Sequence, residues 1–316
     1  MARLGVGLEA VNTLIAARID HTDPFIAGAN RHLTEAGGKR FRPLLTLLAA
    51  ELGSGMNEQV VAAAAGVELT HLASLYHDDV MDEADVRRGT PSANAAYGNS
   101  TAILVGDLLF GTASDIVADL GPEAVKIQAQ TFVRLCSGQI RDDRPCPPGE
   151  DPVAYLLGVL ADKTGVLIAT AARYGAMFGG SDAATVEIMR EYGERLGMAF
   201  QLADDLIDIG SDGEQTGKTP GTDLREGKRT LPVLHALAST DPADARLQEL
   251  LLGDLSTDDA LAEAVGLLRA HPAMGLAREH TYAVASGAQD VLAPLPASDA
   301  KAALLALATG VVTRVG

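Results

Sequence analysis

Two aspartate clusters are the parts of this 316-residue chain whose residue types and spacing could bind a metal ion. In the first cluster, HDDVMDEAD, Asp78, Asp82 and Asp85 recur at i, i+4 and i+7, so a helix would place their carboxylates on one face. Asp79 lies beside that column, and the preceding segment 67–75 is mostly apolar. Such a cluster can be a solvated acidic face, but at the end of a buried helix it is more typical of metal ligands.

The second cluster, FQLADDLIDIGSD, repeats the pattern with Asp204, Asp208 and Asp212, with Gln201 one turn earlier and Asp205 beside the column. One DDxxD motif arises easily by chance, whereas two copies on apolar helices form a specific signal. Facing each other across a cavity, the carboxylates would supply only oxygen ligands, which favour Mg²⁺ over zinc or copper. Mg²⁺ usually keeps positions for water and substrate phosphates, so the motifs predict a phosphorylated substrate.

Basic residues gather beside both clusters, although the chain carries a formal net charge of −17. They occur in four segments, GGKRFRP (Lys39, Arg40, Arg42), RRG (Arg87, Arg88), DKTG (Lys163) and GKTPGTDLREGKRT (Lys218, Arg225, Lys228, Arg229). His71 precedes the first motif by two helical turns, where a lone histidine is more often a core residue. Any one segment could be a solvated surface run. Together they favour a diphosphate site with magnesium, because arginine and lysine both bind phosphate groups.

The elements that must position these residues are predicted to be helices. Ala/Leu-rich segments with helical periodicity are separated by short Gly, Pro and Asp breaks, and strand-like alternation is hard to find. We therefore expect an all-α bundle of about ten or more helices in one domain, residues 1–316. A hydrophobic content of 47% excludes general disorder, while the acidity and an aromatic content of 4% argue against nucleic acid as a partner.

Three further features bear on where the protein resides. Cys136 and Cys146 are ten residues apart, a spacing that suits neither a redox pair nor a zinc site and is compatible with a reducing cytoplasm. The first residues lack the pattern of a signal peptide. Asp107 and Arg173 interrupt the longest apolar stretches, so we expect no transmembrane segment and a cytoplasmic location.

Taken together, these segments resemble the trans-isoprenyl diphosphate synthase (polyprenyl synthetase) family, and most of all its bacterial long-chain polyprenyl diphosphate synthases. The resemblance covers about residues 37–233 in the family's motif order, through GGKRFRPLL, HLASLYHDDVMDEADVRRGTPSAN, GDLLF, GQI, DKTGVLI, FQLADDLIDIGSD and GKTPGTDLREGKRTLP. It implies the isoprenoid synthase fold, in which the helices of each subunit of a homodimer surround a deep central cavity. It also implies head-to-tail condensation of isopentenyl diphosphate with an allylic diphosphate such as farnesyl or geranylgeranyl diphosphate.

The resemblance further implies a role for each residue at a matching position. Three magnesium ions would be held by Asp78, Asp82 and Asp204, supported in catalysis by Asp79, Asp205, Asp208 and Lys163. The allylic diphosphate would be bound by Arg87, Lys163, Thr164, Gln201, Lys218 and Lys228. A metal-free pocket for isopentenyl diphosphate would comprise Lys39, Arg42, His71 and Arg88.

In this family the growing tail runs beside the helix that carries the first motif, and the residues four and five before it set the floor. Here these residues are Ser74 and Ala73, which are small, so we expect a long-chain product of six or more units for a quinone side chain. Alternatively, a bulky residue on a neighbouring helix, such as Phe110 or Phe132, could limit the product to geranylgeranyl or farnesylgeranyl diphosphate.

Two other functions share part of this pattern. A class I terpene cyclase has the first aspartate motif, but its second metal motif usually differs and its cavity is usually rich in aromatic residues. A non-catalytic subunit of a heteromeric synthase typically lacks some of these aspartates or cations, and none is missing here. Turnover of isopentenyl diphosphate distinguishes all three functions.

Overall fold

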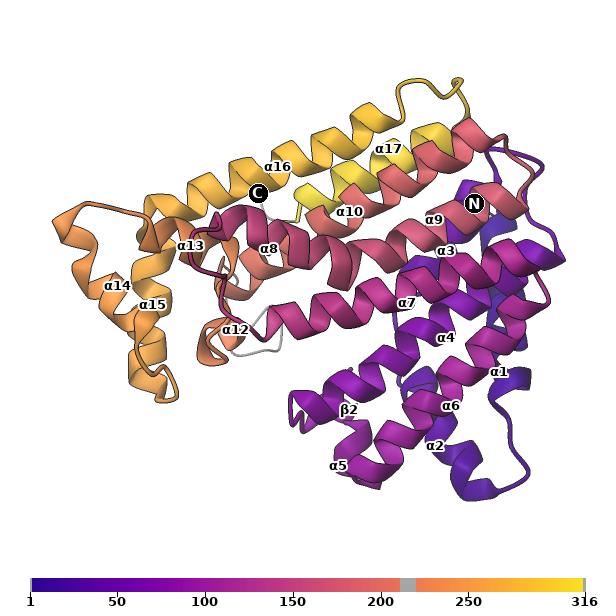
Figure 1. Cartoon of the computed structure of the whole chain (residues 1–316), viewed down its shortest axis with the longest axis horizontal. Coiled ribbons are helices and arrows are strands. Elements are labelled where there is room, and N and C mark those ends of the chain that lie inside the picture. The colour runs from indigo at the N-terminus through magenta and orange to yellow at the C-terminus, as the bar shows by residue number, and fades with distance from the viewer. Residues whose placement is uncertain (1, 211–219, 315–316) are drawn as a thin grey trace. The chain divides into compact units, whose positions relative to one another are not determined.

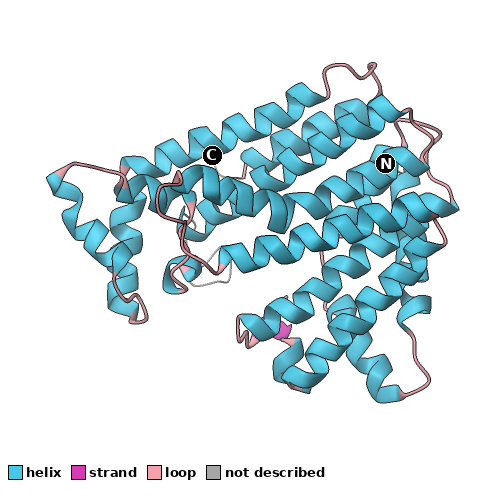
Figure 2. Ribbon diagram, viewed as in Figure 1, coloured by secondary structure: helices cyan, strands magenta, loops and turns pink. Residues whose placement is uncertain are grey.

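The computed structural model describes residues 2–210 and 220–314, and helices form nearly all of their regular structure (Figures 1 and 2). The longer helices are α1 (Ala2–Ile19), α2 (Pro24–Glu35), α3 (Phe41–Ala50), α4 (Glu58–Met81), α6 (Asn99–Ala118), α7 (Pro122–Asp142), α8 (Pro152–Leu160), α9 (Val166–Phe178), α10 (Ala183–Gly210), α14 (Ala245–Leu252), α15 (Asp258–Ala270), α16 (Pro272–Val291) and α17 (Asp299–Val312). The shorter ones are α5 (Ala93–Tyr97), α12 (Thr222–Arg225), α13 (Leu231–Leu237), the π-helical turn η1 (Ala161–Gly165) and the 3₁₀ turn η2 (Pro242–Asp244). The prediction of an all-α fold is confirmed.

A single β-ladder occurs within the described ranges. Strand β1 (Val86–Arg87) pairs antiparallel with β2 (Thr90–Pro91), in a register that aligns Val86 with Pro91. This hairpin carries the RRG segment directly after the first aspartate motif, with Gly89 at its turn. The hairpin brings Arg87 back to the end of α4, where it contacts Asp79, and directs Arg88 to the carbonyls of Leu33 and Gly37.

Contacts group the chain into two compact units. Unit 1 comprises Met1–Val133, Leu167–Gly193 and Leu295–Lys301, and unit 2 comprises Arg134–Val166, Glu194–Pro294 and Ala302–Gly316. Each unit has its own hydrophobic core. The first aspartate motif lies in unit 1 and the second in unit 2.

In unit 1, helix α4 is buried along most of its length and packs mainly against α6. The side chain of Asn57 caps its first turn by accepting a hydrogen bond from the Val60 backbone N–H (3.0 Å). Small residues let α6 approach closely: a Cβ at Gly66 would lie 2.8 Å from a Val117 methyl group. A tightly packed helix therefore carries the first motif at its C-terminal end.

In unit 2, the second half of α10 is amphipathic. Leu202, Leu206 and Ile209 recur at i, i+4 and i+7 and lie in the core with side chains of α13, α15 and α16. Burial of that face leaves Asp204 and Asp208, at i and i+4, on a different side of the helix. The hydrophobic pattern thus fixes the direction of the second motif.

Two helical stretches, Asn99–Ala118 and Pro152–Phe178, are long and apolar enough to cross a membrane by length and composition alone. Core helices of water-soluble proteins pass the same test, so this is weak support for a membrane span. The first stretch contains Asp107, whose carboxylate lies 3.4 Å from the His77 ring.

Candidate active site

The first motif occupies the end of α4. Asp78 lies in the last turn and is half-buried, while Asp82 caps the helix, with its backbone N–H donating to the Asp78 carbonyl (2.8 Å). The Asp82 carboxylate is exposed. Two carboxylates one turn apart, one half-buried and one exposed, can thus bind a cation from solvent.

Asp79 is different from its neighbours because it is fully buried. Its Oδ1 accepts from Arg87 Nε (2.6 Å) and its Oδ2 from the Ala93 backbone N–H at the start of α5 (3.3 Å). The same guanidinium lies 4.0 Å from Asp82 Oδ2. Asp79 therefore holds Arg87 and the first turn of α5 in place, which makes it a structural support for the site.

Arg88 joins two basic segments that are far apart in the sequence. Its guanidinium donates to the carbonyls of Leu33 (3.0 Å) and Gly37. A Cβ at Gly38 would lie 2.9 Å from the Arg88 guanidinium carbon, and Gly38 has a φ of +140°, which side-chain-bearing residues rarely adopt. The glycine pair of GGKRFRP is thus explained by the packing of Arg88 against it.

Glu68 is a buried carboxylate that the sequence analysis did not single out. It forms an ion pair with Arg40 (2.8 Å), and its side chain is only 3% exposed. Its negative charge also acts on Arg42 and Arg88, where it opposes the effect of burial on their pKa values. The available signal was a lone acidic residue within the apolar run of α4, one turn before His71.

Arg42 retains an unused hydrogen-bond donor. Its Nε is buried and has no hydrogen-bond partner within the described part of the chain. Burial lowers the pKa of Arg42 to about 10, with Glu68 opposing and Arg88 reinforcing the shift. The neighbouring Lys39 is exposed. A buried cationic donor without an acceptor suits the binding of an anion.

His71 lies among these arginines. Burial, followed by the positive charges of Arg42, Arg88, Arg87 and Arg40, lowers the pKa of His71 well below its ordinary value. We therefore expect a neutral imidazole at pH 7. Excess inorganic diphosphate should raise this pKa, because an anion offsets the surrounding positive charge.

An NMR titration of the histidine ring protons, with His71→Gln to assign the signal, checks this expectation. His71 should stay neutral in the pH range where an unfolded chain binds the proton, near pH 6.5, because its pKa in the folded protein is well below the ordinary value. The unfolded state then binds more protons, so this residue lowers the stability of the fold as the pH drops below about 6.5. A folded-state pKa at or above 6.5 would contradict the proposed surroundings.

In unit 2, the aspartates of the second motif have separate partners. Asp208 accepts hydrogen bonds from the backbone N–H groups of Thr222 (3.3 Å) and Asp223 (3.1 Å), and so caps α12. Asp204 forms an ion pair with Arg314 (3.0 Å), whose guanidinium lies 5.2 Å from the centre of the Phe200 ring. Arg314 lies outside every motif, and the sequence offered no signal for its contact with Asp204.

Asp205 is buried and linked to two other predicted site residues. Gln201 donates to its carboxylate (3.0 Å) and accepts from the Thr164 hydroxyl (3.4 Å). Burial, followed by the charge of Asp223, raises the pKa of Asp205 to about 8. Without a cation nearby, Asp205 is therefore mostly protonated at pH 7, and a bound cation would favour its ionised form.

Asp142, at the end of α7, was also missed from the sequence. Its Oδ2 accepts from both Lys163 Nζ (2.6 Å) and Lys228 Nζ (3.2 Å). Burial raises its pKa, but the two ammonium groups outweigh burial and hold the pKa below its ordinary value. One carboxylate oxygen therefore brings together two lysines that the resemblance assigns to the allylic diphosphate. The acidic pair that follows GQIR was the available signal.

Other basic residues of the last segment do not join this group. Arg225 forms an ion pair with Asp258 (2.6 Å) on α15. Arg229 is exposed, and Lys218 lies outside the described residues. Unit 2 thus gathers Lys163, Thr164, Gln201, Lys228 and the second motif, while unit 1 gathers Arg42, His71, Arg87, Arg88 and the first motif.

The polyprenyl synthetase family model matches residues 23–268 of the chain. The chain belongs to the polyprenyl synthetase family. It is 46% identical over all its 316 residues to nonaprenyl diphosphate synthase of Mycobacterium tuberculosis (strain ATCC 25618 / H37Rv), of which it covers 94%. The protein is accordingly a prenyltransferase.

Two solved structures have the same fold. Geranylgeranyl pyrophosphate synthase from Corynebacterium glutamicum, complexed with calcium and isoprenyl diphosphate, is 43% identical with a TM-score of 0.89, covering 100% of this chain and 97% of that one. Polyprenyl synthase from Caulobacter crescentus CB15, in a complex of the same description, is 36% identical with a TM-score of 0.91, covering 100% and 98%. The fold is that of the isoprenoid synthases, as the resemblance implied.

The two solved structures above are complexed with calcium, and the residues present in this chain fit a divalent metal. The described residues contain no group of three or more His, Cys, Asp or Glu side chains that could enclose a metal ion unaided. Mg²⁺ needs no such group, since it typically takes one or two carboxylates and completes its coordination with water and phosphate. Asp78 with Asp82, and Asp204 with its acidic surroundings, offer the hard oxygen donors that Mg²⁺ prefers.

Unit 1 also contains a largely apolar, partly open cavity of about 250 Å³. It is lined by Thr70 of α4, by Phe110, Ser114 and Val117 of α6, and by Val125, Gln128, Ala129 and Phe132 of α7. Thr70 precedes Asp78 by two turns on the same face of α4, with Ser74 between them. Ala73, in contrast, is fully buried in the core of unit 1 and does not line this cavity.

Two aromatic rings stand at the side of this cavity. Phe110 and Phe132 make an edge-to-face contact, with ring centres 4.4 Å apart, and the His77 ring lies 5.7 Å from Phe110. These are the two phenylalanines that the sequence named as an alternative limit on the length of the tail.

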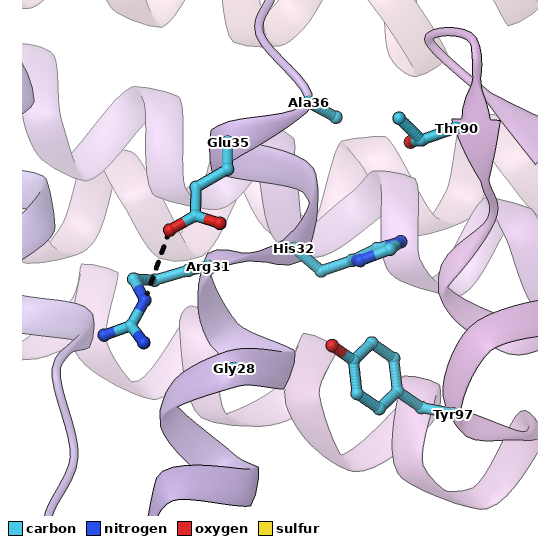
Figure 3. Close-up of a pocket in the computed structure, with 7 residues that line it drawn as sticks. All are labelled: Gly28, Arg31, His32, Glu35, Ala36, Thr90 and Tyr97. Carbon is cyan, nitrogen blue, oxygen red and sulfur yellow. Dashed lines mark ion pairs between the residues drawn. The ribbon is translucent and has the colours of Figure 1, made fainter.

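A second hollow in unit 1, of about 360 Å³, is more polar (Figure 3). It is lined by Gly28, Arg31, His32 and Glu35 of α2, by Ala36 directly after that helix, by Thr90 of β2 and by Tyr97 of α5. The Arg31 guanidinium pairs with both Asp20 (3.2 Å) and Glu35 (3.3 Å). Because its cation is already compensated by two carboxylates, this hollow is a poor diphosphate site.

Proposed function

We propose that the protein condenses isopentenyl diphosphate head to tail with an allylic diphosphate, farnesyl or geranylgeranyl diphosphate, and repeats this step to make a long-chain all-trans polyprenyl diphosphate. The observation that carries this proposal is the apolar cavity below the first motif on the same face of α4. A cavity in that position can receive a lengthening hydrocarbon tail. The 46% identity to a nonaprenyl diphosphate synthase supports a long product, and a quinone side chain is the use we infer.

The reaction begins when the C–O bond of the allylic diphosphate breaks. Asp78, Asp82 and Asp204 would hold magnesium ions, whose positive charge would stabilise the departing diphosphate. Lys163 and Lys228 bind the same diphosphate, and they exchange their contact with Asp142 for one with the substrate. Arg87, Thr164, Gln201 and Lys218 complete this site.

Isopentenyl diphosphate must keep its own C–O bond, so a pocket with cations but no metal suits it. Arg42, His71, Arg88 and Lys39 form that pocket in our proposal, with the unused Arg42 Nε as one donor. The double bond of isopentenyl diphosphate attacks the allylic cation, a C–C bond forms, and a proton leaves to the released diphosphate. Apolar walls exclude water, which would otherwise convert the cation into an alcohol.

The product length of the wild-type enzyme tests the proposal. Incubation with Mg²⁺, excess labelled isopentenyl diphosphate and farnesyl diphosphate, followed by dephosphorylation and chromatography, should give chains of six or more units. Products of four or five units would establish the short-chain alternative, which the Phe110–Phe132 pair and the likeness to a geranylgeranyl pyrophosphate synthase favour. Consumption of farnesyl diphosphate alone would indicate a terpene cyclase, and absence of turnover a non-catalytic subunit.

We further propose that the chain forms one catalytic domain and that two copies associate as a homodimer. On α6 the side chains of Ile103, Leu104 and Leu108 are apolar and exposed, as expected of a surface that a second copy covers. Light scattering should therefore give twice the chain mass of 32.7 kDa.

We also propose that the protein acts in the cytoplasm and does not bind nucleic acid. The free cysteines, Cys136 and Cys146, suit a reducing compartment, which cell fractionation can check. The net charge of −17 disfavours nucleic acid.

A further inference from the structure

Lys163 and Thr164 lie in an unusual piece of backbone. Between α8 and α9 the chain passes through the π-helical turn η1 (Ala161–Gly165), in which the Val166 N–H donates to the Ala161 carbonyl. A π-turn places one more residue in the turn than an α-helix does, so it changes the directions in which its side chains point. Turns of this kind are uncommon and need support from neighbouring elements.

A network of ion pairs within unit 2 supplies such support. Arg134 of α7 donates from Nε to Asp162 (2.7 Å) and from Nη2 to Glu194 of α10 (2.5 Å). Arg141, two turns further along α7, lies 3.3 Å from the other oxygen of Asp162. The Asp162 and Glu194 side chains are only 22% and 19% exposed. One guanidinium therefore connects α7, η1 and α10.

The backbone packs closely at the same place. A Cβ at Gly138 of α7 would lie 2.4 Å from the Lys163 backbone N, and a Cβ at Gly165 would lie 3.0 Å from the Glu194 carbonyl. Both glycines let neighbouring backbone approach the turn more closely than a larger residue would. The π-turn is thus held between α7 and α10 by backbone contact as well as by Arg134.

We propose that Arg134 is a positioning residue for the allylic diphosphate site. Its guanidinium, shared between Asp162 and Glu194, fixes the π-turn so that Lys163 and Thr164 reach their partners. In this arrangement Asp162 contacts Arg134 and Arg141 of α7. The next two residues of the turn reach their own partners, because Lys163 Nζ contacts Asp142 and the Thr164 hydroxyl contacts Gln201. This inference depends on the proposed function, since it requires Lys163 and Thr164 to bind substrate.

Steady-state kinetics of Arg134→Ala tests the proposal. The KM for the allylic diphosphate should rise about tenfold or more, because a mispositioned lysine loses a charge-assisted contact. The KM for isopentenyl diphosphate should change less than about twofold. Arg134→Lys keeps the charge but lacks the planar fork that reaches two carboxylates, so it should restore only part of the loss. The matched control is Arg246→Ala, which removes an exposed two-carboxylate pair with Glu249 (2.9 Å) and Glu263 (2.7 Å) and should change neither KM.

A double variant tests whether Arg134 acts through the π-turn. If it does, Asp162→Asn should also raise the allylic KM, and Arg134→Ala with Asp162→Asn should be little worse than either change alone. If the two substitutions instead raise the allylic KM independently, so that their factors multiply in the double variant, Arg134 does not act through Asp162 and the proposed role of the π-turn is overturned. Equal losses for both substrates, in proportion to a loss of folded protein, would show a merely structural role and overturn the proposal.

A binding measurement separates this inference from the proposed function. Calorimetric titration of inorganic diphosphate in the presence of Mg²⁺ needs no turnover, and Arg134→Ala should weaken binding about fivefold or more, as Lys163→Ala should. Suppose that the wild-type enzyme condenses its substrates and that Arg134→Ala has the same affinity for diphosphate and the same KM for the allylic substrate. That result would overturn this inference and leave the proposed function intact. A wild type that neither binds diphosphate nor condenses its substrates would overturn the proposed function and, with it, this role for Lys163.

Discussion

Asp78→Ala and Asp204→Ala should each lower the turnover number with saturating Mg²⁺ by several orders of magnitude. In our proposal each change removes a carboxylate that would hold a metal ion, and with it the positive charge that would stabilise the departing diphosphate. The fold should survive both changes. Asp78 is half-buried at the end of α4, and the Asp204 side chain is 38% exposed, so neither truncation leaves a cavity in a core.

The matched control is Asp115→Ala, which removes the same charge from an exposed ion pair with Arg18 (2.7 Å) on α1. This variant should keep wild-type turnover and lose at most about 1 kcal/mol of stability. Circular dichroism of all three variants should show unchanged helix content. Near-wild-type turnover of either Asp78→Ala or Asp204→Ala would contradict the metal assignment.

Substitutions that fill the apolar cavity of unit 1 should shorten the product by several isoprene units. Ser74→Phe places a ring one turn above Thr70, and Ala129→Phe places one directly on the cavity wall. The first condensation should continue at nearly the wild-type rate, because neither residue touches the diphosphates in our proposal. Phe132→Ala should act in the opposite direction and lengthen the product, which chromatography of the dephosphorylated chains can measure.

The burial of a position decides whether a substitution there can serve as a control. Ala118→Phe adds the same ring to the exposed end of α6, outside the cavity lining, and should leave the product distribution unchanged. Ala73→Phe is unsuitable because Ala73 is fully buried in the core, where overpacking costs about 1–3 kcal/mol. An unaltered product distribution with both Ser74→Phe and Ala129→Phe would show that the tail takes another path.

The sequence predicted the helical class and both aspartate motifs because each depends on a repeated spacing. Helical periodicity recurs over many turns, and the DDxxD pattern occurs twice, so each prediction rests on several residues at once. Gly37 and Gly38, which form one of the short Gly breaks between helical segments, likewise follow the end of α2 at Glu35. These features are local, and local spacing is what a sequence displays directly.

Features that depend on contacts between distant segments were not predicted. Glu68 and Asp142 are important because of cations that other segments of the chain bring to them. The π-turn at residues 161–165 was also missed, because one added residue in a helix leaves no composition signal. Similarly, spacing alone could not show that Asp208 caps α12 or that Ala73 lies in the core while Thr70 lines the cavity.

The burial of Asp79 bears on how inactive alleles would behave in a cell. Loss of Asp79 leaves the first turn of α5 and the Arg87 guanidinium, whose side chain is 29% exposed, without their acceptor, and removing such a partner typically costs about 1–3 kcal/mol. A destabilisation of that size reduces the steady-state amount of a protein through chaperones and proteases. A cell with an allele altered at Asp79 would therefore contain little of the protein. A cell with an allele altered at the adjacent Asp78 would contain a normal amount of protein that lacks catalytic activity. An immunoblot beside an activity assay distinguishes the two alleles, although they alter adjacent residues of the same motif.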